Sequence, residues 1–265
     1  MMRRFAPLVL LAALAASAVA QVGVDQPSGT LIIDQPRPSA VDPASDYITV
    51  GQDEPGFRAW VAAAPYRPMY VKAFNDYLVT NGVGGVAPTW QLLRTATDWQ
   101  KCGAEPFEIA PTEGWPNIVA ALRYVGAFVE PAIGPVEPVS VYRNPALNRC
   151  AGGAPESTHR TVGAIDMVPL RPIGREALMV ALCRLHLASG SWNGIGLGFY
   201  KGIRFHIDAK KYREWGTQSA SGEWGCSAVL GGPPRRIEPA VPPPPVPPPV
   251  AIPPADPLAP LPPAR

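Results

Sequence analysis

The sequence predicts an α+β domain in which a small antiparallel sheet is flanked by helices. Segments with apolar residues at helical spacing begin early in the chain, and short strand-like runs bounded by Gly, Pro or Asn gather later. No internal repeat is visible. The domain is expected over residues 45–229, which is long enough to build one hydrophobic core.

Three helices are expected, over residues 69–79, 115–129 and 175–189, because each segment has an apolar stripe with a period near 3.6 residues. Pro116 suits the first turn of the second helix, since its missing N–H would have no intrahelical partner there. Gly190 is a natural stop for the third.

Four short strands are expected, at residues 138–142, 164–168, 194–198 and 204–207. The last run alternates polar and apolar residues. On a strand, this alternation places Arg204, His206 and Asp208 on one face and the apolar residues on the other. A face with three such polar groups is either solvated or a functional site.

The two ends of the chain read as segments outside the domain. Basic residues followed by an apolar run over residues 8–20, with a small-x-small pattern before Gln21, predict a signal peptide over residues 1–20 that is cleaved near Ala20. The protein is therefore expected in the periplasm or secreted. No later apolar run approaches the roughly 18–20 residues that span a bilayer, so no stable membrane insertion is expected.

Residues 21–44 are rich in Pro, Asp and Ser and are predicted to be a disordered linker. A Pro-rich tail follows the domain over residues 230–265, where 16 of the 35 prolines lie beyond residue 232. Such a segment favours extended polyproline II over helix or inner strand. Two interpretations remain open: a disordered solubilising tail, or a spacer or ligand for a partner in the cell envelope.

Charge and cysteine content narrow the class of protein. Loss of Arg3 and Arg4 with the signal peptide leaves 21 Lys and Arg against 21 Asp and Glu, so a nucleic-acid partner is not expected.

The four cysteines of an exported chain suggest disulfides, and three pairings are possible. We favour Cys102–Cys150 with Cys183–Cys226, because each pair would hold a loop against a core element.

The candidate chemistry centres on residues 140–166, a Gly-rich segment that contains His159 and Asp166. His206 lies on the polar face of the last predicted strand. Two imidazoles and one carboxylate are a typical ligand set for catalytic zinc, since they leave a fourth position for water. No C-x-x-C pair is present, so a zinc site built from cysteines is not expected.

Several motifs, in order, resemble those of the M15 zinc peptidases. Residues 157–166 (STHRTVGAID) resemble the S-x-H-x6-D pattern of that family, and residues 140–143 (SVYR) resemble its S-x-Y-R. Residues 194–208 (GIGLGFYKGIRFHID) are similar to its G-x-G…F-x-H-x-D ending. The resemblance covers about residues 95–216 and is closest to the A branch of the family, the D-alanyl-D-alanine carboxypeptidases. It implies the M15/hedgehog-like fold.

The resemblance implies a role for each matched residue. His159, Asp166 and His206 would ligate Zn²⁺, and Arg143 would bind the terminal carboxylate of the substrate or the developing oxyanion. The implied function is an exported metallopeptidase that cleaves peptidoglycan stem peptides, either as a D,D-carboxypeptidase or as an endopeptidase. Tyr200, in the loop before His206, is the best placed aromatic residue for substrate binding.

Two departures from the family pattern matter. Val162 stands where the family usually has Gly, three residues after the first His. Ile203 stands where many members have the acidic general base, three residues before the last His. Asp208 is then either the base or a residue that orients His206, and the residues favour neither role.

The missing acid at position 203 motivates a competing hypothesis, which the Pro-rich tail fits equally well as a tether: a noncatalytic cell-wall-binding module that keeps a structural zinc site. The third histidine, His186, is expected to be a surface residue or a packing residue with its hydrogen bonds satisfied, and not a ligand.

Overall fold

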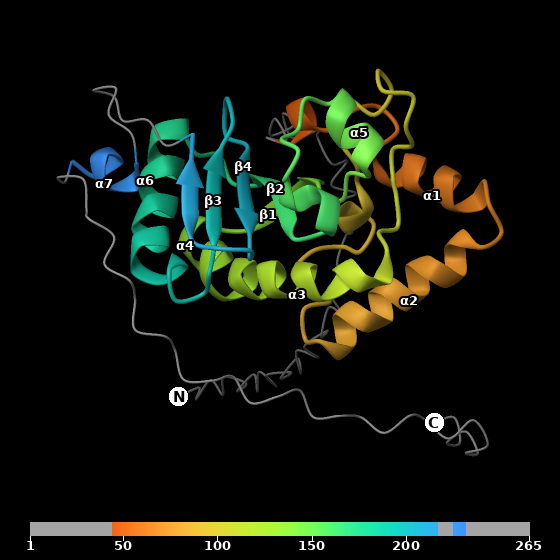
Figure 1. The fold of residues 1–265 in the computed structure, drawn as a ribbon, viewed down its shortest axis with the longest axis horizontal. Coiled ribbons are helices and arrows are strands. Elements are labelled where there is room, and N and C mark those ends of the chain that lie inside the picture. Colours follow the sequence, from red (N-terminus) through yellow and green to blue (C-terminus); the bar gives the residue numbers. More distant parts are fainter. Residues whose placement is uncertain (1–43, 217–224, 232–265) are drawn as a thin grey trace, which may run out of the picture. The chain divides into compact units, whose positions relative to one another are not determined.

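The computed structural model describes residues 44–216 and 225–231. The predicted signal peptide, nearly all of the predicted linker and residues 232–265 of the predicted tail lie outside these described residues. The described chain contains helices and a single five-stranded sheet (Figure 1), so the α+β class is confirmed. No helix among the described residues is both long enough and apolar enough to cross a bilayer.

The sheet has the strand order β1-β2-β4-β3-β5. Its strands are β1 (Val136–Ser140), β2 (Ala164–Pro169), β3 (Gly196–Phe199), β4 (Phe205–Asp208) and β5 (Arg213–Trp215). The neighbouring pairs β1–β2, β2–β4 and β3–β4 are antiparallel.

The prediction of an antiparallel sheet is wrong for the last strand, because β5 runs parallel to β3 and the sheet is mixed. The register explains this direction. β4 ends beside the start of β3, with Asp208 opposite Gly196, and β5 begins at that same end with Arg213 opposite Gly196. The short loop after β4 therefore carries the chain across the end of β3 to its free edge.

The described helices are α1 (Glu54–Ala62), α2 (Arg67–Thr80), α3 (Trp115–Tyr124), α4 (Glu130–Ile133), α5 (Pro145–Cys150), α6 (Arg175–Leu185) and α7 (Cys226–Val229). The three predicted helices correspond to α2, α3 and α6. Beyond α3, the expected second helix passes through a π-turn at Val125–Val129 into α4. A second π-turn at His186–Gly190 extends α6.

Two helices that periodicity did not predict have clear local start signals. Asp53 caps α1 by accepting a hydrogen bond from the backbone N–H of Gly56 at 2.8 Å. Asn144 caps α5 in the same way through Leu147 N–H at 2.9 Å, and each helix has Pro in its first turn. The cap at Asn144 begins α5 directly after Arg143, which matters for the site.

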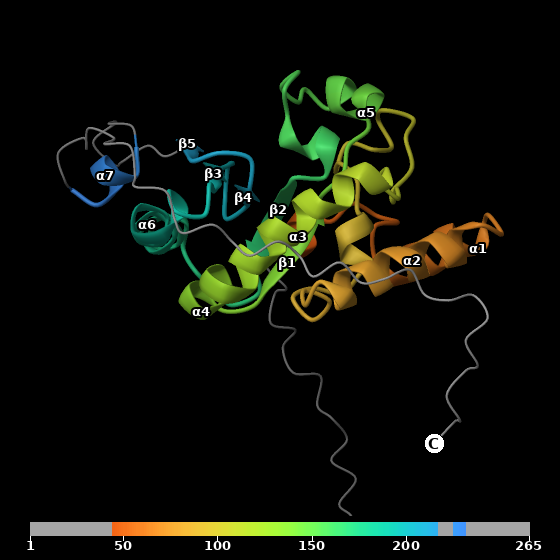
Figure 2. The same cartoon turned by 60° about the horizontal axis from the view of Figure 1, so that its bottom comes forward.

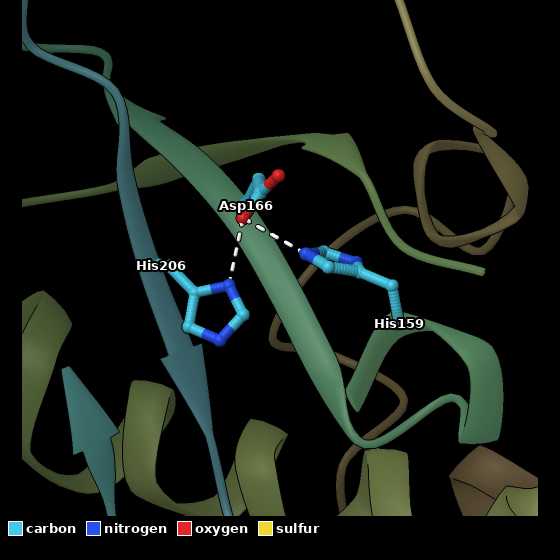
Figure 3. A group of neighbouring side chains, drawn as sticks. All are labelled: His159, Asp166 and His206. Atoms are coloured by element: carbon cyan, nitrogen blue, oxygen red, sulfur yellow. Dashed lines mark hydrogen bonds and ion pairs between the residues drawn. The ribbon is translucent and has the colours of Figure 1, made fainter. Parts of the chain in front are cut away.

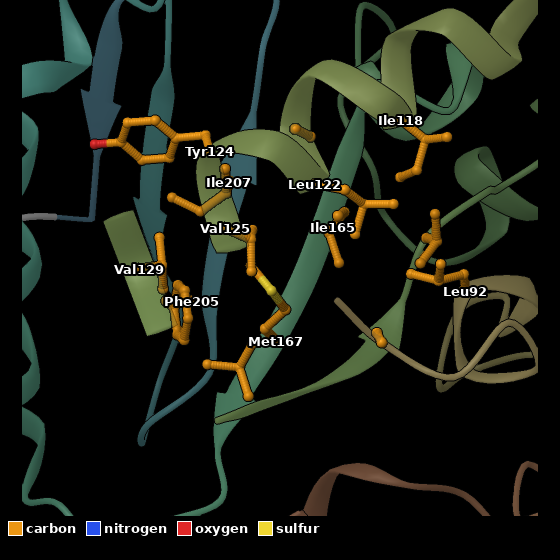
Figure 4. Close-up of a cluster of buried hydrophobic side chains, with 14 of the residues drawn as sticks. Leu92, Ile118, Leu122, Tyr124, Val125, Val129, Ile165, Met167, Phe205 and Ile207 are labelled. Atoms are coloured by element: carbon orange, nitrogen blue, oxygen red, sulfur yellow. The ribbon is translucent and has the colours of Figure 1, made fainter. Parts of the chain in front are cut away.

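The main core lies between α3 with its π-turn and one face of the central strands (Figures 2 and 4). Ile165 and Met167 of β2 and Phe205 and Ile207 of β4 are all buried in it. Each such side chain contributes about 1.5–3 kcal/mol by leaving water. Because side chains alternate along a strand, the residues between them project from the opposite face of the sheet.

Residues 137–141, which lead into the candidate site, are held by contacts with Arg94 earlier in the chain. The buried guanidinium of Arg94 donates from Nη1 to Glu137 Oε1 and to the carbonyl of Pro138, both at 2.7 Å. The backbone N–H of Val141 donates to the carbonyl of Arg94 at 2.9 Å. Together these contacts position the carbonyl of Val141, which contacts a ring nitrogen of the site.

Both disulfides have the favoured pairing, Cys102–Cys150 and Cys183–Cys226. The first holds the loop before residue 107 to the end of α5, and the second joins α6 to α7.

Candidate metal centre

Three residues from separate elements converge on the sheet face opposite the apolar core (Figure 3). Asp166 on β2 pairs in register with His206 on β4, and His159 comes from the 3₁₀ turn Thr158–Thr161. Oδ1 of Asp166 lies 3.1 Å from Nε2 of His159 and 2.9 Å from Nδ1 of His206. One ligand atom from each residue lies within 4.8 Å of the others, and all three residues are buried.

The turn that carries His159 has a definite shape. Ser157 caps it by accepting a hydrogen bond from the His159 N–H, and Gly163 N–H donates to the carbonyl of Thr158 at 3.0 Å. Val162 ends the turn in the left-handed conformation, with φ 59°. A β-branched residue there costs on the order of 1–2 kcal/mol relative to Gly. The side chain of Val162 is buried in the main core, which offsets this cost.

The other ring nitrogen of His159 has its own acceptor. Nδ1 of His159 lies 2.5 Å from the carbonyl oxygen of Val141. A carbonyl can only accept, so this contact requires the proton to reside on Nδ1. The lone pair of Nε2 is then left toward Asp166, which is the arrangement that metal-binding imidazoles adopt.

His206 is held in the same manner with its nitrogens exchanged. Nε2 of His206 lies 3.0 Å from Oδ2 of Asp208, and Nδ1 faces Asp166. The carboxylate of Asp208 also accepts from the backbone N–H of Lys210 at 3.1 Å and from Nη1 of Arg213 at 3.0 Å. Asp208 is fully buried behind the imidazole, on the side away from Asp166.

The donor set therefore fits a divalent metal such as zinc. Each imidazole has one nitrogen committed to an oxygen acceptor and directs the other at the same carboxylate oxygen. Two nitrogen donors and one carboxylate oxygen from buried, oriented side chains are a three-ligand set that leaves a coordination position open.

Two guanidinium groups engage the second oxygen of Asp166. Nη2 of Arg143 and Nη2 of Arg204 both donate to Oδ2, the latter at 2.5 Å. Nε of Arg143 also donates to Ser140 Oγ at 2.9 Å. Arg204 stacks on the ring of Tyr200, with its Cζ 4.5 Å from the ring centroid. Sequence reasoning placed Arg204 on this face and gave it no role.

The charges around the site set the protonation states. Burial alone would raise the pKa of Asp166, but His159, Arg204 and Arg143 hold it well below its usual range. Burial, reinforced by Arg143, lowers the pKa of His159 to about 4. For His206, burial is outweighed by hydrogen bonds to Asp166 and Asp208, and its pKa is raised. A proton on Nδ1 of His206 thus competes with a metal ion for the same lone pair.

A cavity of about 570 Å³ opens over this centre. Its lining includes two of the candidate ligand residues, His159 and His206, together with Arg143 and Tyr200. Residues 151–154 and 156–158 form one wall, and the turn and strand after β4 contribute Lys210, Lys211, Arg213 and Trp215. Glu156 is the one acidic residue among the described residues of this lining.

Two glycines of β3 allow other residues to lie close over the sheet. A Cβ at Gly198 would lie 2.0 Å from the ring of Trp215, and a Cβ at Gly196 would lie 2.2 Å from the carboxylate of Asp208. Trp215 in turn approaches His206, with ring centroids 5.4 Å apart. Gly196 belongs to the G-x-G pattern seen in the sequence, whereas the clearance at Gly198 depends on β5, which periodicity did not predict.

The structure brings together most of the residues proposed from the sequence. His159, Asp166 and His206 converge, Arg143 contacts Asp166, Asp208 contacts His206, and Tyr200 lines the cavity. Lys210, Lys211 and Glu156 also line the cavity, and the sequence pointed to none of them.

His186 lies elsewhere: it is buried and stacks on Tyr212 with ring centroids 4.5 Å apart. Its ring nitrogens have no hydrogen-bond partner within the described part of the chain.

Comparisons with known protein families, with curated proteins and with solved structures gave no match for this chain.

Proposed function

We propose that the protein is an exported zinc peptidase that cleaves peptidoglycan stem peptides, with D,D-carboxypeptidase action as the first choice. The observation that supports this most is the convergence of His159 Nε2, Asp166 Oδ1 and His206 Nδ1 beneath an open cavity. The motif resemblance noted above supplies the substrate class. The two disulfides accord with folding in an oxidising compartment outside the cytoplasm.

Zinc, when bound, would polarise the scissile carbonyl and lower the pKa of a coordinated water to about 7. His159, Asp166 and His206 would hold it. The remaining tasks belong to the cavity, which must bind the anionic end of the peptide, stabilise the developing oxyanion and accept the proton of the attacking water.

Arg143 and Tyr200 suit the first two tasks. Arg143 lines the cavity, and its planar guanidinium can pair with a carboxylate or an oxyanion. Burial and the charge of Asp166 raise the pKa of Tyr200, although Arg143 and Arg204 oppose this shift. Tyr200 therefore keeps its hydroxyl proton at neutral pH and can donate a hydrogen bond to substrate.

The residue that accepts the proton of the attacking water is the one that this chain lacks at its usual place in the family pattern. Ile203 carries no acid and packs against the core. Asp208 is buried and already accepts from Lys210 and Arg213 besides contacting His206, so its geometry favours orienting that ring. Glu156 is exposed and is the remaining carboxylate among the described residues that line the cavity, and we assign it the proton of the attacking water. The leaving amine takes this proton as the peptide bond breaks.

The direct test is to incubate the zinc-loaded mature protein with purified muropeptides. Release of free D-Ala from pentapeptide stems is the expected result, and His206→Ala should release none. Cleavage of cross-linked dimers without release of D-Ala would identify an endopeptidase instead. No product from either substrate, with zinc bound, would refute the peptidase proposal.

A noncatalytic wall-binding module is the second candidate. It is favoured by one specific observation: Ile203 replaces the usual acid, and the nearby Asp208 is fully engaged. This candidate predicts that the zinc-loaded wild type sediments with purified sacculi and yields no product. Product from the wild type alone would exclude it.

A further inference from the structure

The two consecutive lysines after β4 contribute cationic side chains to the cavity lining. We propose that Lys210 and Lys211 form a second anion-binding subsite, which takes a carboxylate of the peptide substrate away from the scissile bond. The identity of the peptide rests on the proposed function, but occupancy of the subsite can be measured without any hydrolysis.

The backbone of the turn that presents the two lysines is tied to the candidate metal centre through one carboxylate. Oδ1 of Asp208 accepts the backbone N–H of Lys210 at 3.1 Å, while Oδ2 of the same group contacts Nε2 of His206. The turn is therefore anchored to the strand that carries a candidate ligand. A substrate group bound by the lysines would be held in the cavity that opens over this centre.

Charge balance within the cavity distinguishes these lysines from the other cations that line it. Arg143 is paired with Asp166, and Nη2 of Arg213 lies 2.7 Å from Oδ2 of Asp208. Within residues 44–216 and 225–231, neither Lys210 nor Lys211 has an ion-pair partner, and both are exposed.

Glu156, the one acidic residue among the described lining residues, forms no ion pair with either lysine in the described part of the chain. Among the described residues, the two lysine side chains therefore carry positive charge that no carboxylate pairs with, and a concave site concentrates that field.

The rest of the lining indicates a peptide as the ligand. Tyr200 and Trp215 offer aromatic surface, and their rings meet edge to face at 4.9 Å between centroids. A cavity of about 570 Å³ has room for a short peptide segment. The N–H groups of Arg143 that Asp166 and Ser140 do not engage can hold one carboxylate, and the lysines, whose ammonium groups act as mobile point charges, can hold a second one. A substrate with two separated carboxylates is thus favoured over one with a single charged terminus.

Equilibrium binding of a matched pair of peptides tests this proposal. The probes are the stem tetrapeptide with a free α-carboxylate on its γ-linked D-Glu and the same tetrapeptide with that carboxylate amidated. Both lack the terminal D-Ala–D-Ala bond, so zinc-loaded protein can be titrated without that cleavage, by calorimetry or by the fluorescence of Trp215 and other tryptophans. We expect wild type to bind the free acid about 5- to 10-fold more tightly, as two exposed charge contacts allow.

The decisive variant is Lys210→Gln/Lys211→Gln, which should bind both peptides alike and as weakly as wild type binds the amide. The control, Lys72→Gln/Lys101→Gln, makes the same charge change at two exposed lysines outside the cavity lining and should keep the preference. Raising the salt concentration should shrink the preference of wild type. Equal binding of both peptides by wild type would overturn the proposal, as would a preference that survives in the Lys210/Lys211 variant.

The outcome is separable from that of the proposed function. Preference for the free acid without release of D-Ala from the pentapeptide would support the subsite and refute the D,D-carboxypeptidase. Release of D-Ala from the pentapeptide without any preference for the free acid would support the D,D-carboxypeptidase and refute the subsite. Inhibition of tetrapeptide binding by an equal concentration of inorganic phosphate would show an unspecific anion site and overturn the peptide subsite.

Discussion

Nε2 of His206 lies 3.0 Å from Oδ2 of Asp208, and both side chains are buried on the face of the sheet that carries the metal centre. The contact uses the nitrogen that is not directed at Asp166. Asp208 thereby fixes the plane of the imidazole and the nitrogen that bears the proton. A metal held by His206 would be influenced by Asp208 through that ring, since Asp208 is not among the three candidate ligands.

The first prediction concerns this contact. Asp208→Asn should lower zinc affinity about 10- to 100-fold, because partners behind metal-bound imidazoles typically contribute that much. Zinc affinity is measured by competition with a chromogenic chelator. Asp76→Asn, which alters an exposed carboxylate paired with Lys72, should leave the affinity unchanged. Full zinc affinity with loss of turnover in Asp208→Asn would instead identify Asp208 as the base.

A second prediction is that Asp166→Asn destabilises the metal-free protein as well as abolishing zinc binding. The carboxylate is fully buried, and Arg143 and Arg204 both pair with it. Removing its charge leaves two largely buried guanidinium groups without a counterion, which should cost about 3 kcal/mol in the free energy of unfolding. Urea denaturation in the presence of EDTA measures this loss. A change below about 1 kcal/mol would mean that the arginines find other partners.

The third prediction addresses Glu156. Glu156→Gln should lower kcat by about 10²- to 10⁴-fold, the usual contribution of a general base, and should leave zinc content and KM nearly unchanged. Glu176→Gln, at an exposed acid on α6, serves as the control. Turnover in Glu156→Gln within about 2-fold of wild type would show that another group accepts the proton.

The fourth prediction is a pH dependence that arises from His186. Burial lowers the pKa of this imidazole to about 4, so between pH 4 and 6.5 the unfolded chain binds a proton that the folded chain does not. Its contribution to stability is therefore complete above pH 6.5 and is lost as the pH falls toward 4.

Between pH 7.5 and 5.0 the loss amounts to about 2 kcal/mol from this group. His186→Phe keeps a ring against Tyr212 without a titrating nitrogen. Its free energy of unfolding should therefore fall by about 2 kcal/mol less than that of wild type between these two pH values. Urea denaturation of both metal-free proteins at the two pH values measures the difference. Identical pH dependence in the two would contradict a buried neutral His186.

The sequence correctly predicted the helices and strands whose signals are local. Helix α6 and the strands β2 and β4 follow from apolar periodicity, and the alternation along β4 correctly separated His206 from Ile207. The favoured cysteine pairing was also confirmed. Strand β5 is three residues long with no apolar alternation, and its parallel direction depends on where β4 ends beside β3. Neither feature can be read from spacing along the chain.

The candidate site also has features that the sequence predicted and features that only the structure could give. The sequence grouped His159, Asp166 and His206 because they occur in ordered motifs, and the structure brings their ligand atoms together. The choice between the two roles of Asp208 required the distances to His206, Lys210 and Arg213, since a strand pattern gives the face of a residue but not its partners. The left-handed turn at Val162 likewise depends on burial of its side chain.

The most direct test of the central claim is the zinc content of the purified mature protein after dialysis against metal-free buffer, measured by mass spectrometry of the metal. The proposed centre predicts about one equivalent of zinc in the wild type and almost none in His159→Ala or His206→Ala. His186→Ala, which removes the histidine outside the centre, should retain the full equivalent. A wild type that holds no zinc after loading, or a His206→Ala variant that holds as much as the wild type, would contradict it.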